Sequence, residues 1–367
     1  MNFQPIEYLE WMIRGPWAPK YDLGLSEPQL EVTAETLGLE AGDIVLDGHN
    51  ALGYEALREH LARRYGVAAE EVLCSLGASM ANYLLCGVLI EPGDEVVVER
   101  PAYEPLVSVP RLFGATVRRL ERSYERDYVL DPSDLEKAIS SKTRLIILTN
   151  LHNPSGVLLS QEVLKAVGER AAQVGAYVLV DEIYLEFLFD RTPPSAFHLG
   201  DNFLITNSLT KVYGLGGLRL GWALCPPELM RRAQELYVSM GVHNPMCSEV
   251  FGHLILSREA IWDRWVESCR QRIDQNRLAV DSFLAGREDL EWVAPAAGVM
   301  IFPRIRGKFT GSQLARQLIE HHETFLVPGR YYEDDRHFRL SFGAPPPDLQ
   351  QGLRHLGEAL DELREAS

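Results

Sequence analysis

One lysine, Lys211, has a setting that could do chemistry, within the segment NSLTKVYGLGGLRLGW of residues 207–222. A lysine in a glycine-rich stretch is commonly an exposed loop residue, and this segment alone leaves that interpretation open. A nucleotide-binding P-loop fits less well, because its lysine follows the glycines and precedes Ser or Thr, whereas Lys211 precedes them and is followed by Val212. A third interpretation is a partly desolvated amine that deprotonates and attacks a carbonyl carbon.

Three other positions could act together with Lys211. Asp181 ends an apolar stretch in DEIY, where a buried carboxylate needs a cation, although an aspartate taken alone is more simply a helix cap or part of an ion pair. The segment NPSG, residues 153–156, is by itself an ordinary turn. Arg339 alternates with apolar residues in HFRLSFG, as an outward-facing residue of a half-buried strand would.

The elements that must position these residues alternate between strands and helices. Short β-rich stretches are expected at residues 95–99, 144–149, 177–180 and 203–206. Between them, a helix is expected behind Ser160, which suits an N-cap, with one apolar face made of Val163, Leu164, Val167 and Ala171. This alternation predicts an α/β fold with a mostly parallel sheet covered by helices on both faces.

The chemistry-bearing segments follow three of these strands directly. NLHNPSG follows residues 144–149, DEIY follows 177–180, and NSLTK follows 203–206. Ligands bind beyond the carboxyl ends of strands in open parallel sheets. We therefore expect the three segments to meet at one edge of the sheet.

The pattern changes after about residue 261. A long amphipathic helix is expected there, followed by short strands in GVMIFPRI and HFRLSFG and by a terminal helix. The length of 367 residues also favours more than one domain. We expect a large cofactor-binding domain at 41–261 and a small α+β domain formed by 1–40 and 262–367.

Composition excludes several classes of protein. With 52 acidic and 36 basic residues the formal charge is −16, which opposes binding to nucleic acid or to an anionic membrane surface. The five cysteines are odd in number and lack CxxC spacing, so neither a disulfide framework nor a metal site is expected. The N-terminus does not resemble a signal peptide, and no segment approaches ~18 consecutive apolar residues. We expect a soluble, cytoplasmic protein.

Taken together, the motifs resemble those of the class I/II aminotransferases, fold-type I enzymes that use pyridoxal 5′-phosphate. The resemblance rests on NPSG, on DEIY 28 residues later, on SLTK, on Arg219 eight residues after Lys211, and on FRLSF. LDPSDLEKAI, GVLLSQEVL and VPGRYY extend it over nearly the whole chain. The resemblance implies an aspartate-aminotransferase-like fold and a homodimer.

The resemblance also implies catalytic roles. Lys211 would form a Schiff base with the cofactor aldehyde and later move a proton at the substrate Cα, which requires a neutral amine that sparse polar surroundings would favour. Asp181 would pair with the protonated pyridine nitrogen. Tyr184 and Asn153 would hydrogen-bond the phenolic oxygen of the ring, and Tyr103 would lie against its face.

The cofactor phosphate and the substrate carboxylate would have separate binding groups. Arg219 and Ser208 would bind the phosphate, together with the backbone amides of Ala78 and Ser79 at a helix N-terminus. Arg339 would hold the substrate α-carboxylate by a two-pronged contact, with Asn153 nearby. No second arginine is identifiable for a side-chain carboxylate, so a neutral amino donor is expected to be preferred over aspartate. Candidates for lining the substrate pocket are Trp11, Trp17, Ser26 and Tyr331.

Two positions depart from the family pattern. A tyrosine that commonly reaches the phosphate of the neighbouring subunit is replaced by Gly48, and His49 or Asn50 could supply the missing hydrogen bond. The usual Gly-Glu-Pro of the substrate loop begins with Ser26. Both changes bear on phosphate binding and on substrate fit.

The expected function is amino-group transfer between an amino acid and a 2-oxo acid. Lyases and cyclases of the same fold share these residues and are the alternative. A cofactor-binding transcription regulator is a third possibility, but such proteins carry an additional DNA-binding domain, for which this chain has no room before residue 21.

Overall fold

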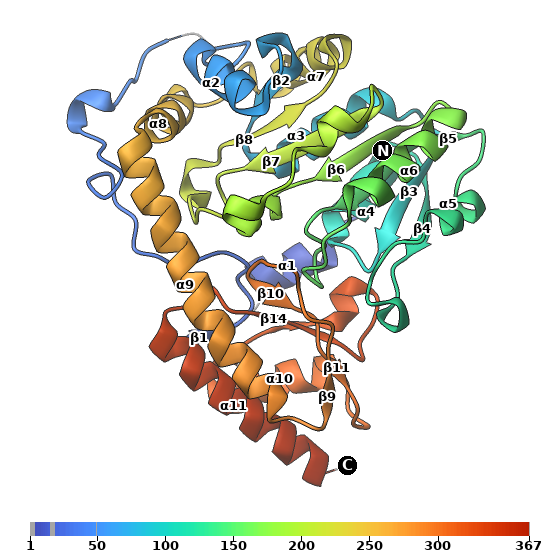
Figure 1. The fold of residues 1–367 in the computed structure, drawn as a ribbon, viewed down its shortest axis with the longest axis vertical. Coiled ribbons are helices and arrows are strands. Elements are labelled where there is room, and N and C mark those ends of the chain that lie inside the picture. The colour runs from blue at the N-terminus through green and yellow to red at the C-terminus, as the bar shows by residue number, and fades with distance from the viewer. Residues whose placement is uncertain (1–3, 15–18, 49, 367) are drawn as a thin grey trace.

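A seven-stranded sheet forms the centre of the larger part of the molecule (Figure 1). The computed structural model describes residues 4–14, 19–48 and 50–366. Strand β8 runs antiparallel to both of its neighbours, and the remaining neighbouring pairs are parallel, so the expected mostly parallel sheet is confirmed. In spatial order the strands are β2 (Val72–Ser75), β8 (Gly221–Leu224), β7 (Phe203–Ser208), β6 (Tyr177–Asp181), β5 (Thr143–Thr149), β3 (Glu95–Arg100) and β4 (Thr116–Glu121).

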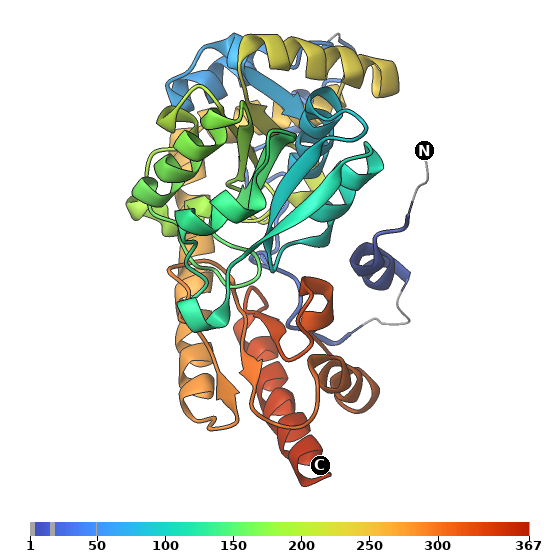
Figure 2. The same ribbon diagram turned by 90° about the vertical axis from the view of Figure 1, so that its right-hand side faces the viewer.

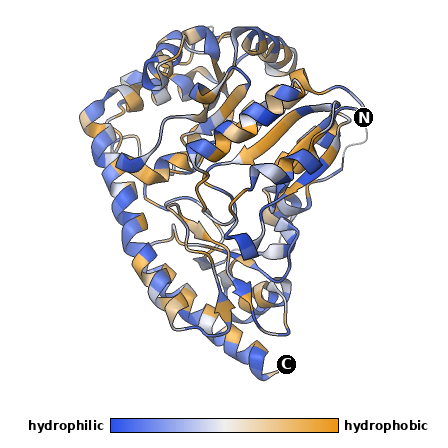
Figure 3. Cartoon of the chain, turned by 45° about the vertical axis from the view of Figure 1, so that its right-hand side comes forward, coloured by the Kyte–Doolittle hydropathy of each residue, from blue (hydrophilic) through white to orange (hydrophobic). Residues whose placement is uncertain are grey.

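Both faces of the inner strands β5, β6, β7 and β8 are largely buried, which explains their apolar stretches (Figure 3). The edge strand β4, with the sequence TVRRLE, is partly exposed. Successive side chains of a strand point to opposite faces. Leu145 and Ile147 of β5 pack with helices on one face, and Ile146 and Leu148 pack with helices on the other. The first face is covered by α3 (Gly77–Leu89), α4 (Glu104–Leu112) and α7 (Pro227–Gly241). The second is covered by α2 (Glu55–Tyr65), α5 (Pro132–Ala138), α6 (Gln161–Gln173) and α8 (Met246–Ser257).

Helix α6 confirms the helix expected behind Ser160. The Ser160 side chain accepts a hydrogen bond from the backbone N–H of Val163, which caps the first turn. Leu164, Val167 and Ala171 are buried, and Val163 is half-buried at the edge of the same face.

The C-terminal part is built from short strands and two helices below the large sheet (Figure 1). Strand β10 pairs with β14, which pairs with β13, β11 pairs with β9, and β1 pairs with β12. Hence the N-terminal segment at Tyr21 joins the C-terminal part. The bounds are β1 (Tyr21–Asp22), β9 (Leu290–Glu291), β10 (Met300–Ile301), β11 (Arg304–Ile305), β12 (Thr324–Phe325), β13 (Val327–Pro328), β14 (Phe338–Ser341), α10 (Gly311–His322) and α11 (Pro346–Glu365).

One expected strand differs from the structure. GVMIFPRI forms two separate two-residue strands, β10 and β11, which pair with different partners. Pro303 lies between them and has no N–H to donate to a continuous ladder.

The short helix α1 (Glu7–Arg14) bridges the two parts of the molecule. Its first backbone amides donate to the Glu104 carboxylate, and its Tyr8 ring contacts Tyr331 in the C-terminal part.

Helix α9 (Glu259–Ala285) runs from the sheet part into the C-terminal part, where it packs against α11 (Figures 1 and 2). Its side chains donate hydrogen bonds to backbone carbonyls of other segments, and three of these bonds join distant parts of the chain. Trp265 Nε1 bonds Tyr213 O at 2.9 Å, Arg272 Nη1 bonds Gln29 O at 2.7 Å, and Asn276 Nδ2 bonds Phe342 O at 2.6 Å. One helix thus holds segments from the beginning, middle and end of the chain.

None of the helices within the described residues is long and apolar enough to cross a membrane. For the domain division we propose the boundaries at residues 41 and 261, with the segments 1–40 and 262–367 forming the smaller domain.

Candidate active site

A cavity of about 480 Å³ lies beyond the carboxyl ends of β5, β6 and β7, at the N-terminus of α3. Eleven of the residues to which we gave a cofactor or substrate role line it, and their individual roles stay predictions. They are Ser26, Ala78, Ser79, Tyr103, Asn153, Asp181, Tyr184, Ser208, Lys211, Arg219 and Arg339.

Asp181 ends β6 as a buried carboxylate whose hydrogen-bond partners are neutral. Asn82 Nδ2 donates to Oδ2 at 3.1 Å and the Ile183 N–H donates to Oδ1 at 3.2 Å, while Thr206 Oγ1 fixes the Asn82 amide at 2.9 Å. Burial raises the pKa of Asp181 to about 6, against the lowering effect of the Asn82 and Ile183 hydrogen bonds. A carboxylate in this setting is well suited to accept a cationic ring nitrogen.

Lys211 follows β7, and its amine does not have the sparse polar surroundings that we expected. Its Nζ lies 3.1 Å from Glu27 Oε2, which is a correction to the sequence-based expectation. Burial lowers the pKa of Lys211, but electrostatic interactions with Tyr184 and with the Glu27 carboxylate outweigh it, so the pKa is raised above its ordinary value of 10.5. Glu27 therefore holds the proton on Lys211 in this form of the protein.

The N-terminus of α3 and Arg219 form one corner of the cavity. Gly77 begins the helix with φ +77°, a left-handed conformation that favours glycine. A Cβ on Gly77 would lie 2.8 Å from Arg219 Nη2, and one on Gly221 would lie 2.4 Å from the Gly77 carbonyl carbon. The Arg219 guanidinium makes only long contacts to Gly216 O, at 3.4 Å, and to Leu76 O, at 3.5 Å, among the described residues. A cation beside free helix N–H groups fits a phosphate.

Arg339 is a buried arginine, not the outward-facing strand residue that its pattern alone indicated. It is 2 % exposed, and within the described part of the chain its guanidinium donates only to neutral oxygens. These are Asn153 Oδ1 at 3.3 Å, the Tyr332 hydroxyl at 2.5 Å, the Tyr8 hydroxyl at 3.4 Å and Gly24 O at 2.6 Å. Because a buried guanidinium is costly without an anion, this site fits a substrate carboxylate.

Tyr184 and Ser26 lie together on the wall of the cavity. The Tyr184 hydroxyl is 2.8 Å from Ser26 Oγ, so the residue that replaces the usual glycine contacts a predicted cofactor ligand directly. The Tyr103 ring meets the Tyr8 ring edge-on, with centroids 5.7 Å apart. Burial raises the pKa of Tyr103, so its phenol stays protonated.

The sequence analysis did not identify several residues of the site. Glu27 stands inside the Ser-Glu-Pro segment and could have been found there. Asn82 and Thr206 carry no motif of their own, and only the packing of α3 against β7 brings them to Asp181. Tyr8 and Tyr332 likewise reach Arg339 from distant segments.

Other sequence-based candidates lie elsewhere. Trp11 and Tyr331 pack on each other with ring centroids 4.8 Å apart, and neither belongs to the cavity lining, to which α1 contributes Tyr8 and Leu9. Trp17 and His49 fall outside the described residues. Asn50 is buried, and its amide nitrogen donates to the Glu249 carboxylate; its role at a phosphate stays a prediction.

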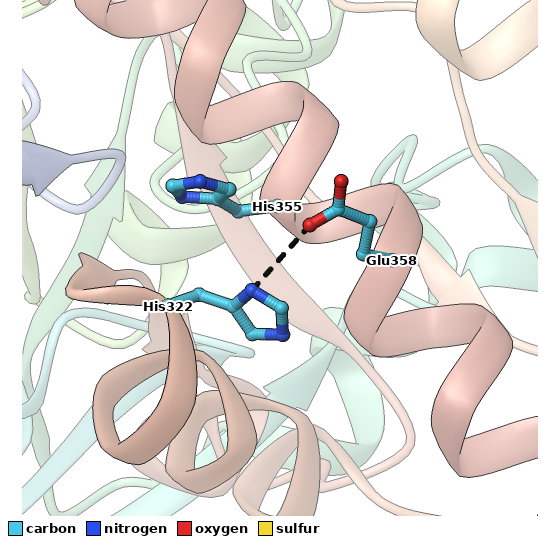
Figure 4. Close-up of side chains that lie close together, drawn as sticks. All are labelled: His322, His355 and Glu358. Atoms are coloured by element: carbon cyan, nitrogen blue, oxygen red, sulfur yellow. Dashed lines mark ion pairs between the residues drawn. The ribbon is translucent and has the colours of Figure 1, made fainter.

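His322, His355 and Glu358 form a separate group whose composition could hold a metal ion (Figure 4). His322 lies 3.5 Å from the Glu358 carboxylate, and both ring nitrogens of His355 already have protein partners, Thr324 Oγ1 at 2.8 Å and Gln351 Nε2 at 2.6 Å. We assign this group no metal.

Comparison with known proteins gives consistent similarities. The chain is 30% identical over 317 residues to capreomycidine synthase of Streptomyces vinaceus, covering 84% of this chain and 80% of the relative. A PLP-dependent aminotransferase from Streptococcus suis superposes with a TM-score of 0.91 at 26% identity, covering 99% of both chains. The PLP-dependent cyclase OrfR superposes with a TM-score of 0.87 at 28% identity, covering 99% of this chain and 98% of that one.

A family model, aminotransferase class I and II, matches residues 21–356. The aspartate-aminotransferase-like fold and the enzymatic character expected from the motifs are thereby confirmed. The chain belongs to the aminotransferase class I and II family.

Proposed function

We propose that this protein is a pyridoxal 5′-phosphate-dependent aminotransferase that moves an amino group between an L-amino acid and a 2-oxo acid. One observation carries the proposal: a single cavity contains a lysine, a buried carboxylate with neutral partners, and a buried guanidinium that has no carboxylate partner among the described residues. The site as a whole thus has a place for an aldehyde, a cationic ring nitrogen and a substrate carboxylate.

The residues present fit pyridoxal phosphate. Arg219, Ser208 and the amides of Ala78 and Ser79 would hold its phosphate, and Asp181 would hold its ring nitrogen. When bound, the cofactor supplies an aldehyde carbon and an electron-withdrawing ring.

The remaining steps belong to residues of this chain. Arg339 orients the substrate by its α-carboxylate, which places the Cα proton near Lys211. Lys211 Nζ would accept that proton and later give a proton back, so the same side chain would act first as the base and then as the acid. Glu27, 3.1 Å from Nζ, stabilises the ammonium form that results. Tyr184, held by Ser26, positions the ring oxygen.

The attachment to Lys211 has a direct test. Lys211→Ala should abolish the covalent link between protein and cofactor, because no other amine occupies the motif position. Borohydride reduction followed by mass spectrometry of the protein measures it. Cofactor mass retained on the variant would contradict the assignment of Lys211.

A second candidate is a cyclase or lyase of the same fold, and the similarity to capreomycidine synthase and to the cyclase OrfR favours it. Incubation with one amino acid and no 2-oxo acid separates the reactions. An aminotransferase stops after one equivalent of oxo acid per active site. A lyase continues to turn over and releases ammonia. A cyclase consumes its substrate and releases neither ammonia nor an oxo acid.

We also propose a homodimer. Large apolar side chains are exposed in two neighbouring segments, which Gln234 Nε2 joins by a hydrogen bond of 2.8 Å to Ala51 O. An association surface is the simplest reason for such a patch. Light scattering should give twice the chain mass, and Leu46→Asp should lower it towards one chain. The exposed residues are Ile44, Leu46, Leu52, Val238, Met240 and Val242.

A further inference from the structure

One wall of the active-site cavity is apolar and has no part in the chemistry proposed above. Three helical segments each contribute two apolar or aromatic side chains to it, and in each pair the two residues are three positions apart, so they lie on one face of their helix. We call these six side chains the apolar wall. They are Ile6 and Leu9 at α1, Met80 and Tyr83 on α3, and Leu106 and Val109 on α4.

The apolar wall begins beside the predicted carboxylate site. Tyr8 stands between Ile6 and Leu9 in the sequence, and its hydroxyl lies 3.4 Å from Arg339 Nη2. The Tyr8 ring meets the Tyr103 ring edge-on, with centroids 5.7 Å apart, and Tyr103 directly precedes α4. A substrate whose carboxylate is held by Arg339 therefore has α1 and α4 next to it.

Helix α1 is attached to the beginning of α4. The Glu104 carboxylate accepts hydrogen bonds from the backbone N–H of Glu7, at 3.0 Å, and from that of Tyr8, at 2.7 Å. The Glu10 N–H donates to Ile6 O at 2.9 Å, so Ile6 belongs to the first turn. The pairs on α1 and α4 are thus held in place before a ligand binds, which lowers the ordering cost of binding.

Charged side chains in the cavity lining are, among the described residues, Asp181, Lys211, Arg219 and Arg339. Each of them has a predicted partner in the cofactor or in the substrate α-carboxylate. Glu27 is not part of the lining, and its carboxylate lies 3.1 Å from Lys211 Nζ. Within the described lining no charged group therefore remains for a second charge on a substrate, and an unpaired charge beside apolar side chains is costly.

The apolar wall still has surface that a ligand can cover. Leu106 is buried, whereas the other five side chains are half-buried. Removing such surface from water by an apolar group is favourable in proportion to the area covered. The wall therefore favours a ligand that extends from Arg339 as a hydrocarbon chain or ring.

We propose that the active site takes an amino acid with a large, uncharged, apolar side chain, of the kind found in leucine, methionine or phenylalanine, and places that side chain against the apolar wall. The proposal rests on the function proposed above, because it requires that Arg339 holds the α-carboxylate. Acidic and basic amino acids are then poor substrates. The preference is the same whether the bound amino acid undergoes amino transfer or cyclisation.

The test measures the binding of unreactive carboxylates to the cofactor-loaded enzyme. Hexanoate, adipate and ε-aminocaproate share one carbon chain, and they correspond to norleucine, aminoadipate and lysine without the α-amine. Acetate and butanoate are the short references. The change in cofactor absorbance during titration gives each dissociation constant.

Hexanoate should bind about fifteenfold more tightly than butanoate, because each of its two additional methylenes should contribute about fourfold. Adipate and ε-aminocaproate should bind at least about tenfold more weakly than hexanoate, because their second charge has no partner at the wall. This ranking is measured on the parent enzyme and needs no variant.

Two variants locate the binding. Val109→Asp should weaken hexanoate about tenfold, leave acetate unchanged, and favour ε-aminocaproate over hexanoate, because it places a carboxylate in the wall. Val129→Asp, at an exposed valine outside the cavity lining, is the matched control and should behave like the parent. Arg339→Lys should weaken all five ligands by the same factor, because it changes only the carboxylate contact.

Two results would overturn the proposal and leave the proposed function intact. One is adipate or ε-aminocaproate binding to the parent as tightly as hexanoate. The other is a Val109→Asp variant that keeps the parent's ratio of hexanoate to acetate affinity; a lowered mass of that variant in light scattering would assign the wall to subunit association instead. Ligands that bind Arg339→Lys as tightly as the parent would show that the predicted carboxylate site, and with it the proposed function, is wrong.

Discussion

Asp181→Asn should make the cofactor-free protein more stable at alkaline pH. The pKa of the Asp181 carboxyl is raised from 3.8 to about 6, mainly by burial. Ionising this carboxyl in the folded protein therefore costs about 3 kcal/mol more than ionising it in the unfolded chain. Asparagine carries no charge and escapes this cost. It can accept from only one of Asn82 and Ile183, and losing the other hydrogen bond costs about 1 kcal/mol at every pH.

The sign of the pH dependence follows from the raised pKa. The carboxyl is neutral in both states well below pH 3.8, so the cost is absent there, and it reaches its full value above about pH 6. Between pH 5 and pH 8 the cost grows by about 1.4 kcal/mol. The variant should therefore gain that much stability relative to the parent over this interval, and at pH 8 it should be about 2 kcal/mol more stable.

Urea unfolding of the cofactor-free proteins at pH 5 and pH 8 measures this difference. Asp201→Asn, at an exposed position, is the control and should show no change of the difference with pH. A stability difference for Asp181→Asn that is the same at both pH values would show that burial does not penalise this carboxylate. The same variant should lose most of its activity, because its amide cannot hold a cationic ring nitrogen.

Three further variants test other parts of the site. Glu27→Gln removes the carboxylate 3.1 Å from Lys211 Nζ and should therefore make this nitrogen easier to deprotonate, both as the free amine and when it is bonded to the cofactor. The pH titration of the absorbance of the cofactor-loaded enzyme should move to lower pH, and an unmoved titration would remove Glu27 from the site. Arg339→Lys should raise KM for amino donors strongly and leave the cofactor absorbance intact, and an unchanged KM would show that the α-carboxylate binds elsewhere. Gly221→Ala should weaken cofactor binding by tenfold or more, on the order of 1.4 kcal/mol, since its Cβ would meet the Gly77 backbone at 2.4 Å; Gly217→Ala, with open space around its Cβ, is the control, and equal cofactor affinities measured by fluorescence would contradict the role of the α3 corner.

The sheet and the edge where the site lies could be predicted because they depend on local patterns. A strand buried on both faces must be apolar, and the polar segment after it must lie at its carboxyl end. Asp181 and Lys211 were therefore placed correctly at one cavity from their positions after two such strands.

Contacts made between distant segments could not be predicted in the same way. Glu27 and Lys211 are 184 residues apart, and their ion pair depends on how the N-terminal segment crosses the sheet. Trp11 was expected near the substrate because of its position in the sequence, but the rotation of α1 turns Tyr8 toward the cavity and Trp11 toward Phe325. Arg339 looked exposed because strand alternation does not reveal that both faces of β14 are covered.

Helix α9 places a constraint on how this sequence can change over evolution. Trp265 fixes the loop that carries Lys211, and Asn276 fixes the segment after Arg339. Eleven residues of helix separate them, about 16 Å. One inserted residue would turn Asn276 by roughly 100° around the helix axis and away from its carbonyl. Substitutions at the exposed positions of this interval should therefore be tolerated, whereas a change in its length should separate the lysine from the guanidinium that presents the substrate to it.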